Sequence, residues 1–376
     1  MFRPPHCPNP ECPNHFRPQG RPWYRFYAFY TTKAFGKVPR FLCTSCRKTF
    51  SSQTFRLDYY AKKRLDYRFL FQQFTSASGL RNIARNLGVR VETVANRLDR
   101  LARNAILAHE QLLLPLSLQE DLALDGFESF CGSQYHPDNT HFVVGKDSQF
   151  VYALDYVSLR RKGRMTEKQK RRRAELESLW KPPPKAVERS FGDLIRWVLE
   201  RSWERRRPII LYTDEKPDYL RALKRDPVCR QAFFCGLIRH HRTNSREIRN
   251  HRNPLFPVNY IDREVRKDVA AHGRETVKFN RDVGEGVFRL ALYLFDHNYF
   301  KPYRIGQGRL EELRHSDLAG VSREKADRWA KRFFTDRFFW REREHELKGA
   351  GRKTLDQRWV TPIKGSRRVF VRHLAA

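Results

Sequence analysis

Four cysteines near the N-terminus constrain the fold of this chain more than any other feature of its sequence. Cys7 and Cys12 form one pair with four residues between them, and Cys43 and Cys46 form a second pair with two residues between them. Closely spaced cysteines place two thiolates on one tetrahedral zinc ion, and a second pair closes the coordination shell. The segment between the pairs is rich in aromatic residues and is broken by a glycine, which favours a β-ribbon. A unit this small needs a metal to be stable, so residues 1–56 are predicted to form a zinc ribbon.

Two other interpretations of these cysteines are open. They could be unrelated free thiols, or His6 or His15 could replace one ligand, because the spacing of the first pair is looser than usual. The chain has seven cysteines, an odd number, and four of them lie in the two pairs. This pattern is typical of a metal site in a reducing compartment and not of a disulfide framework.

The chain is strongly basic. It has 75 Lys and Arg residues against 42 Asp and Glu, a formal net charge of +33 over 376 residues. An excess of this size is tolerated most easily when a polyanion neutralises it, so nucleic acid is the expected partner. The alternatives are a solvated basic surface or a ribosome-associated protein. Since we find neither an apolar stretch of roughly 18 residues nor the apolar segment of a secretory signal, we expect a cytoplasmic, nucleoid-associated protein.

Residues 57–110 have the hydrophobic spacing of a helix-turn-helix. A first helix is predicted over residues 58–74. In the segment that follows, a short apolar face and a second face, formed by Val94, Leu98 and Leu101, are separated by a glycine turn. The second helix of such a unit enters the major groove of DNA. The alternative is an ordinary pair of packed helices with a basic solvent face. The residues predicted to contact DNA from this unit are Arg81, Thr93, Asn96, Arg97 and Arg100.

Residues 118–304 alternate between strand-like and helical segments, which predicts an α/β domain. Three strand-like runs follow one another and predict a meander. A highly charged, proline-containing stretch comes next, and helical patterns then surround a buried strand. We interpret Asp155, which also lies on a strand, as a structural acid. The predicted strands are 122–130, 141–145, 150–157, 208–215 and 233–238, and the predicted helices are 191–203, 218–224 and 258–269.

Three acids of this region are candidates for a metal site. Asp125 lies on a strand among apolar neighbours, Asp214 lies near the end of another strand, and Asp262 lies on a helix, nearer to its apolar face than Glu264. Two Mg²⁺ or Mn²⁺ ions about 3.5–4 Å apart, held by hard oxygen ligands, activate the attacking oxygen of a phosphodiester reaction and steady the leaving one. For each acid the alternative is a surface carboxylate or an ion pair, such as Asp262 with Arg266.

Four motifs occur together with the cysteine pairs between about Cys7 and Arg304. They are "RNIARNLGVRVETVANRL", "LALDGFESF", "ILYTDEKPDYLRAL" and "NYIDREVRKDVAAHGRETVKFNRD". The set resembles the DDE transposases of prokaryotic insertion sequences. In that family the catalytic domain is similar to RNase H, and a helical insertion can precede the last acid. The resemblance implies that Asp125 and Asp214 are the first two acids. It implies Asp262 as the third, since it is followed by Arg, although the family usually has Glu there; Glu264 is the reserve.

The resemblance implies a multidomain α/β protein. A zinc ribbon and a helix-turn-helix would precede an RNase H-like DDE catalytic domain at residues 118–304, with a basic helical insertion at about residues 160–206. A small basic helical region would follow at residues 305–376. This last region could contact DNA or form a dimer, or it could be a stabilising appendage.

The function implied by the resemblance is that of a transposase, which binds element-end DNA and catalyses metal-dependent strand cleavage and strand transfer. Its partners would be double-stranded DNA, at the terminal inverted repeats and at the target, and further copies of itself in a homo-oligomer on DNA. Arg266, Arg274 and Lys278 would clamp phosphates. The alternatives are a non-catalytic zinc-ribbon and helix-turn-helix regulator, or an RNase H-like nuclease that cuts without joining.

Overall fold

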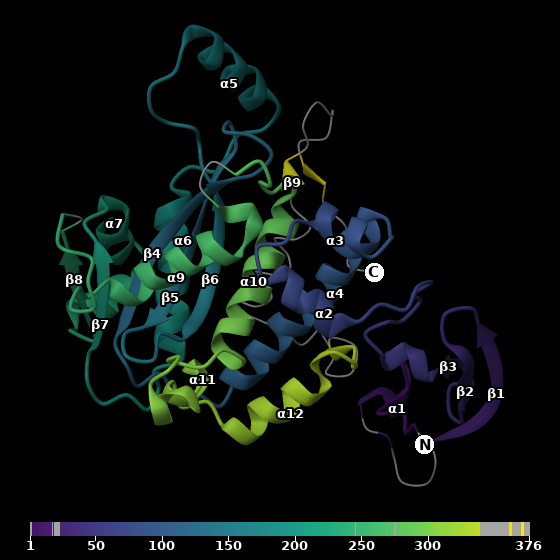
Figure 1. The fold of residues 1–376 in the computed structure, drawn as a ribbon. Coiled ribbons are helices and arrows are strands. Elements are labelled where there is room, and N and C mark those ends of the chain that lie inside the picture. The colour runs from purple at the N-terminus through teal and green to yellow at the C-terminus, as the bar shows by residue number, and fades with distance from the viewer. Residues whose placement is uncertain are drawn as a thin grey trace.

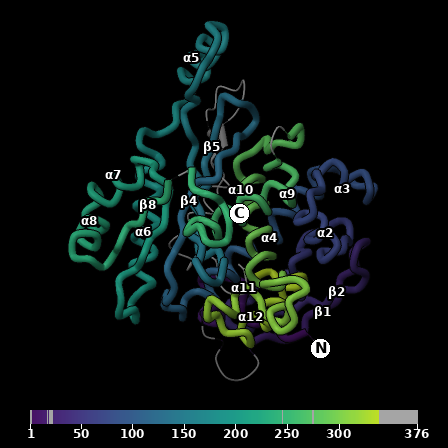
Figure 2. Tube along the Cα trace, turned by 60° about the vertical axis from the view of Figure 1, so that its left-hand side comes forward, coloured from purple at the N-terminus to yellow at the C-terminus, as the bar shows by residue number. Residues whose placement is uncertain are grey.

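The chain folds into a mixed α/β structure (Figure 1). The computed structural model describes residues 2–16, 18, 23–244, 246–273 and 276–338, together with the backbone of four residues in two short C-terminal strands. A small sheet near the N-terminus lies on one side, a larger sheet with its helices lies on the other, and a group of helices lies between them (Figures 1 and 2). Within the described residues, no helix has the length and apolar character needed to cross a membrane.

The N-terminal unit is a three-stranded antiparallel sheet with an aromatic core. As the sequence predicts, the segment between the cysteine pairs forms a β-hairpin, and Gly36 at its turn has a φ of +64°. The core consists of aromatic rings and cysteines, and it includes Trp23, Phe41, Phe50 and Phe55. The elements are α1 (Pro13–Phe16), β1 (Tyr24–Thr32), β2 (Gly36–Cys43) and β3 (Thr49–Ser51), with the strands in the order β1-β2-β3.

Three helices follow: α2 (Tyr67–Phe74), α3 (Leu80–Asn86) and α4 (Val91–Leu113). The prediction of a helix from residue 58 is wrong at its start, since residues 58–66 are not helical. Asp66 sets the beginning of α2, because its carboxylate accepts hydrogen bonds from the N–H groups of Arg68 at 2.8 Å and Phe69 at 3.3 Å. Between α3 and α4, Gly88 has a φ of +59°, as the predicted turn requires.

The larger sheet has five strands in the order β6-β5-β4-β7-β8. The predicted meander is present, because β4, β5 and β6 pair antiparallel, whereas β7 and β8 run parallel to β4. The prediction of a strand at residues 233–238 is wrong, because the chain there ends a helix and turns before the last strand begins. The strands are β4 (Leu122–Phe130), β5 (Pro137–Gly145), β6 (Val151–Ser158), β7 (Ile209–Asp214) and β8 (Ile238–Thr243).

Helices cover both faces of this sheet. α6 packs on β5 and β6 from one side, and α9 packs on β4 and β5 from the other. Along β4, Leu122 and Leu124 belong to the core on one face, whereas Ala123 and Phe127 belong to the core under α9. Because side chains alternate along a strand, Asp125 points to the α9 face. The helices are α6 (Ala186–Glu200), α7 (Pro217–Arg225), α8 (Pro227–Phe234), α9 (Phe256–Asp268) and α10 (Val283–Tyr299).

The predicted insertion at residues 160–206 divides into two different parts. The first part contains α5 (Glu167–Leu179), which has no buried residue and stands away from the body of the protein (Figures 1 and 2). The second part is α6, whose apolar face is buried against the sheet. The prediction is therefore wrong for α6, which belongs to the core of the domain.

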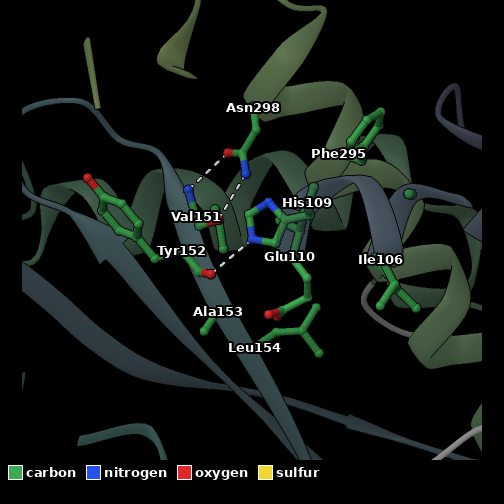
Figure 3. A pocket seen from close by; sticks show the side chains of 12 residues that line it. Ile106, His109, Glu110, Val151, Tyr152, Ala153, Leu154, Phe295 and Asn298 are labelled. Carbon is green, nitrogen blue, oxygen red and sulfur yellow. Dashed lines mark hydrogen bonds between the residues drawn. The ribbon is translucent and has the colours of Figure 1, made fainter. Parts of the chain in front are cut away.

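The second half of α4 joins the helical unit to the larger sheet, at the pocket shown in Figure 3. Burial lowers the pKa of His109 to about 4, so its ring is neutral at pH 7. Its Nε2 donates to the carbonyl of Tyr152 on β6 at 2.9 Å, and its Nδ1 accepts from the hydroxyl of Tyr299 on α10, also at 2.9 Å. Asn298 of α10 pairs with the N–H of Val151 at 2.9 Å and with its carbonyl at 2.8 Å. α4, β6 and α10 are thus tied together by hydrogen bonds.

The described part of the C-terminal region packs against α4. It contains α11 (His315–Leu318) and α12 (Arg323–Phe333). The amide of Asn104 on α4 donates to the carbonyls of Phe333 at 3.0 Å and Asp336 at 2.8 Å. This packing favours the stabilising-appendage interpretation for residues 305–338. Most of residues 339–376 lie outside the described residues, apart from the backbone of β9 (Thr361–Pro362) and β10 (Phe370–Val371).

Candidate functional site

The four N-terminal cysteines meet at one point. The Sγ atoms of Cys7 and Cys46 are 3.5 Å apart, those of Cys12 and Cys43 are 3.7 Å apart, and all four lie within 4.8 Å of one another. A tetrahedral zinc ion with Zn–S distances of about 2.3 Å separates its sulfur ligands by roughly 3.8 Å. The four thiols can therefore hold a metal ion such as zinc.

The two histidines near this cluster have another role. The Nδ1 atoms of His6 and His15 both lie within hydrogen-bond distance of the carbonyl of Cys7, at 3.0 and 2.7 Å, and their rings meet edge to face. They hold the loop that carries Cys7, while the four cysteines supply the complete set of sulfur ligands. The geometry favours four cysteines over a site in which a histidine replaces one.

Polar donors around Cys43 favour its thiolate. Burial alone raises the pKa of the Cys43 thiol, but the backbone N–H groups of Cys46 and Ser45 and the side-chain amide of Asn14 lower it more, to about 7. The Asn14 amide lies 3.7 Å from the Cys43 Sγ and also donates to the Ser45 hydroxyl at 2.7 Å. Since thiolate is the form that binds metal, these donors suit a metal centre.

Two of the residues predicted to contact DNA do not lie on an exposed face. Arg97 and Arg100 are buried, at 4% and 7% exposed. Arg100 donates to the carbonyls of Leu57 and Tyr59, both at 2.7 Å, and Arg97 donates to the carbonyl of Lys63 at 3.3 Å. The prediction of an exposed position is wrong for both, because their guanidinium groups satisfy the carbonyls of the irregular segment before α2.

The remaining predicted residues of the helical unit are accessible. Arg81 on α3 and Asn96 on α4 are exposed, and Thr93 is partly exposed. The Asn96 side-chain oxygen accepts from both buried arginines, at 2.7 and 2.8 Å, which leaves its amide group for other contacts. Arg85 and Arg90 are also exposed. The sequence analysis did not name them, although their helical spacing from Arg81 and Thr93 is a usable signal.

The three aspartates occupy neighbouring positions on the larger sheet and on the helix that covers it. Asp125 lies near the middle of β4, Asp214 ends β7, and Asp262 lies on α9. Ala123 pairs with Tyr212 where β4 and β7 run in parallel, so Asp125 and Asp214 stand two residues further along their strands in the same direction. The Asp214 carboxylate accepts from the N–H of Lys216 at 2.9 Å.

Burial and mutual repulsion couple these carboxylates. Burial, and then the charge of Asp214, raise the pKa of Asp125 to about 6. Burial, and then the charge of Asp125, raise the pKa of Asp262 to about 8, against the opposing effect of Arg266 and Arg249. The Oδ1 atom of Asp262 is buried and has no hydrogen-bond partner among the described residues. A buried, unpaired carboxylate oxygen near the charge of another acid is costly unless a proton or a metal cation neutralises it.

The carboxylates are spaced more widely than the cysteines. Among the described residues, the cysteines are the group of three or more ligand-bearing side chains whose atoms lie within 4.8 Å of one another. Two divalent ions about 3.5–4 Å apart require acids on both sides of the pair and not three oxygens around one point. Asp125, Asp214 and Asp262 do not form such a close group, although they offer the hard oxygen ligands that Mg²⁺ and Mn²⁺ prefer.

Two other acids lie apart from this cluster. Glu264 forms ion pairs with Lys267 at 2.5 Å and with Arg263 at 3.6 Å, and its charge acts on the nearby tyrosines of α9 and α10. Asp155 lies on β6 in register with His141 of β5, so β5 separates it from Asp125. Glu264 is therefore paired with cations of its own helix, and Asp155 is separated from Asp125 by a strand.

The three residues predicted to contact phosphates differ in their surroundings. Arg266 donates to the carbonyl of Glu128 on β4 at 3.1 Å, and its guanidinium lies 4.4 Å from the centre of the Phe127 ring. Lys278 is exposed, with its Nζ 3.5 Å from the carbonyl of Ala77 in the turn before α3. Arg274 lies outside the described residues.

Tyr219 belongs to this region although the sequence pattern does not predict it. Tyr219 of α7 is fully buried, and its hydroxyl donates to the Asp125 Oδ1 at 3.4 Å. Its ring stacks on Phe191 of α6, with 4.6 Å between ring centres. Its signal in the sequence is weak, because it is only a tyrosine five residues after Asp214 in a segment predicted to be helical.

Comparisons with known proteins assign no family to this chain. No protein-family model matches it, and no curated protein matches it.

Proposed function

We propose that this protein is a DDE-type transposase, with three aspartates in the acid positions, that cuts and joins DNA strands with divalent metal ions. The observation that carries the proposal is the level placing of Asp125 and Asp214 on two parallel strands, together with Asp262 on the covering helix, which has a buried, unpaired oxygen and feels the charge of Asp125. Because three antiparallel strands followed by two parallel ones are compatible with an RNase H-like sheet, the strand arrangement supports the same proposal.

The three carboxylates would hold the metal ions. When bound, Mg²⁺ or Mn²⁺ would activate the attacking oxygen of water or of a 3′-hydroxyl and stabilise the leaving oxygen. Tyr219 donates to one oxygen of Asp125, which orients the carboxylate and leaves its second oxygen available as a ligand. Arg266 and Arg249 lower the pKa of Asp262 and therefore favour its ionised, metal-binding form.

The N-terminal half of the chain would select and hold the DNA. The four-cysteine cluster would bind zinc and stabilise the small aromatic unit that carries it. The exposed faces of α3 and α4, with Arg81, Arg85, Arg90 and Asn96, would contact element-end DNA. Buried residues of α2, α3, α4 and the larger sheet belong to one apolar cluster, so the bound DNA could be fixed relative to the acids.

The test is an assay of strand cleavage and joining on DNA that carries the ends of the element, with Mg²⁺ present. We expect nicked and joined products from the native chain and loss of both from Asp125→Ala and Asp214→Ala. Glu264→Gln is the matched control, because it removes an acid from the same helix outside the cluster, and it should retain activity.

Other outcomes would contradict the proposal. Tight DNA binding without metal-dependent products would favour a non-catalytic regulator. Cleavage without joining would favour a nuclease. Unchanged activity in Asp125→Ala and Asp214→Ala would refute the assignment of the acids.

A further inference from the structure

The helix α5 is an exposed, basic arm. We use this name for α5 and its flanking segments, residues 160–185, which contain eleven Lys and Arg residues and three Glu, a net charge of +8. α5 stands off the body in both views, and none of its residues is buried (Figures 1 and 2). Most helices of folded proteins are stabilised by an apolar face packed on a core, so the arm is not explained by a contribution to the core.

One side of α5 is held by the segment that precedes it, and this segment contacts the body of the protein at Tyr135. Arg160 makes two hydrogen bonds to the Glu177 carboxylate, at 2.7 and 2.9 Å. Arg173 donates to the carbonyl of Arg161 at 3.1 Å, and the Arg161 guanidinium lies 4.7 Å from the centre of the Tyr135 ring. The residues on this anchored side of the helix and just after it are Arg173, Leu176, Glu177 and Trp180.

The other side of the arm carries cations that no acid neutralises. Arg164, Lys168 and Arg171 are exposed, and the structure gives them no hydrogen bond or ion pair with any described residue. At about 100° per residue, Lys168 and Arg171 lie roughly 160° around the helix from the anchored side. Elsewhere on α5, Lys170 pairs with Glu167 and Arg172 pairs with Glu175, both at 2.7 Å. Lys168 and Arg171 therefore face away from the anchored side, and Arg164 is exposed in the segment just before the helix.

The arm leaves the sheet at the end toward which β4, β6 and β7 run. It follows the end of β6, and β5 begins at the same edge because the two strands are antiparallel. β4 ends there too, at Phe130, since it is antiparallel to β5, and β7 runs toward the same end because it is parallel to β4. Asp125 and Asp214 lie level with each other, five residues before the end of β4. A duplex laid across the three aspartates can therefore continue toward the arm.

We propose that Arg164, Lys168 and Arg171 bind the phosphates of duplex DNA beyond the acids, as a contact separate from the helix-turn-helix. This inference rests on the proposed function for the position of the DNA. Duplex DNA fits this surface because its regularly spaced phosphates complement unpaired cations, two on the anchored helix α5 and Arg164 in the segment just before it. The contact is independent of base sequence, since no base edge need be read.

The test measures how binding depends on salt. The full chain is titrated with a duplex of about 40 base pairs at several salt concentrations, in Ca²⁺ so that the DNA is not cut, and log K is plotted against log salt. Each phosphate contact contributes about 0.9 to the slope. The triple variant R164Q/K168Q/R171Q should therefore lower the slope by about 2–3. Its stability should not change, because the three side chains make no contacts that the fold needs.

Two controls separate charge at this site from charge in general. The variant K224Q/R230Q/R239Q removes three exposed cations from α7, α8 and β8 and should leave the slope unchanged. The charge-preserving variant R164K/R171K should keep the native slope. An unchanged slope in the arm triple overturns this inference and leaves the proposed function intact. Failure of the native chain to bind any duplex overturns both. A slope reduced equally in both triples also overturns this inference, because the effect would then be one of net charge.

Discussion

Replacing Asp262 with Asn should stabilise the protein at high pH in the absence of Mg²⁺. Burial and the charge of Asp125 raise the pKa of Asp262 from 3.8 to about 8, so the folded state retains a proton that the unfolded state has lost. Stability therefore falls as the pH rises from about 4 to about 8, and the full penalty applies above that range. The asparagine side chain has the same shape and no charge, so it escapes the penalty.

The magnitude follows from the linkage between the proton and folding. Between pH 5 and pH 8 the native protein should lose about 4 kcal/mol relative to Asp262→Asn, at about 1.4 kcal/mol for each pH unit. Relaxation around the charge and proton sharing with Asp125 reduce this value, and we expect at least about 2 kcal/mol. For a unit of 150–250 residues that difference raises the unfolding midpoint by at least roughly 4 °C.

The assay is thermal unfolding at pH 5 and pH 9 in buffer without Mg²⁺. No chelator is added, so that metal at the cysteine cluster is retained. Glu264→Gln is the control; it breaks the ion pair with Lys267 and should give no gain at pH 9. Adding Mg²⁺ at pH 9 should raise the midpoint of the native protein, because the ion binds only the folded acids, and it should raise that of Asp262→Asn much less. An equal difference between Asp262→Asn and the native protein at both pH values would refute the reasoning, because it would reflect packing and not charge.

Three further predictions concern other parts of the chain. The native protein should bind about one metal ion per chain, and Cys43→Ser should lose it and unfold the N-terminal sheet. Metal analysis measures the loss of the ion, and near-ultraviolet circular dichroism measures the unfolding. Arg100→Ala should cost roughly 2–4 kcal/mol, because the carbonyls of Leu57 and Tyr59 lose their donor, whereas the exposed Arg81→Ala should weaken DNA binding with unchanged urea unfolding. Tyr219→Phe keeps the ring and removes a donor that lowers the pKa of Asp125. The acid limb of the pH–activity profile should therefore shift to higher pH by less than about one unit. A uniform loss of activity without that shift would indicate a packing defect alone.

Local sequence patterns predicted much of the fold. The meander, the strand that ends in Asp214 and the helix that carries Asp262 were all visible as periodic runs, because strands and helices with one buried face repeat every two or about 3.6 residues. The same rule failed for residues 233–238. An apolar run that short fits either a strand or the end of a helix, and only contacts with α6 and α7 decide between them.

The candidate site shows the same division. Periodicity already placed Asp262 nearer the covered face of its helix than Glu264, and in the structure Glu264 forms an ion pair with Lys267. Periodicity could not show that Arg97 and Arg100 turn inward, because their partners are carbonyls about 34 and 43 residues earlier in the chain. It could not reveal Tyr219 either, because the hydrogen bond to Asp125 spans 94 residues.

The sequence by itself determined which groups this protein has to work with: four closely spaced thiols, a strongly positive charge and a set of acids on predicted strands and a helix. Spacing along the chain is enough for these features, because their geometry is local. Only the tertiary structure decided which cations are occupied by the protein's own carbonyls and which remain outward-facing on α5, and which acids share one buried region of the sheet. These are long-range outcomes, since burial and charge coupling depend on segments that the sequence separates and the fold brings together.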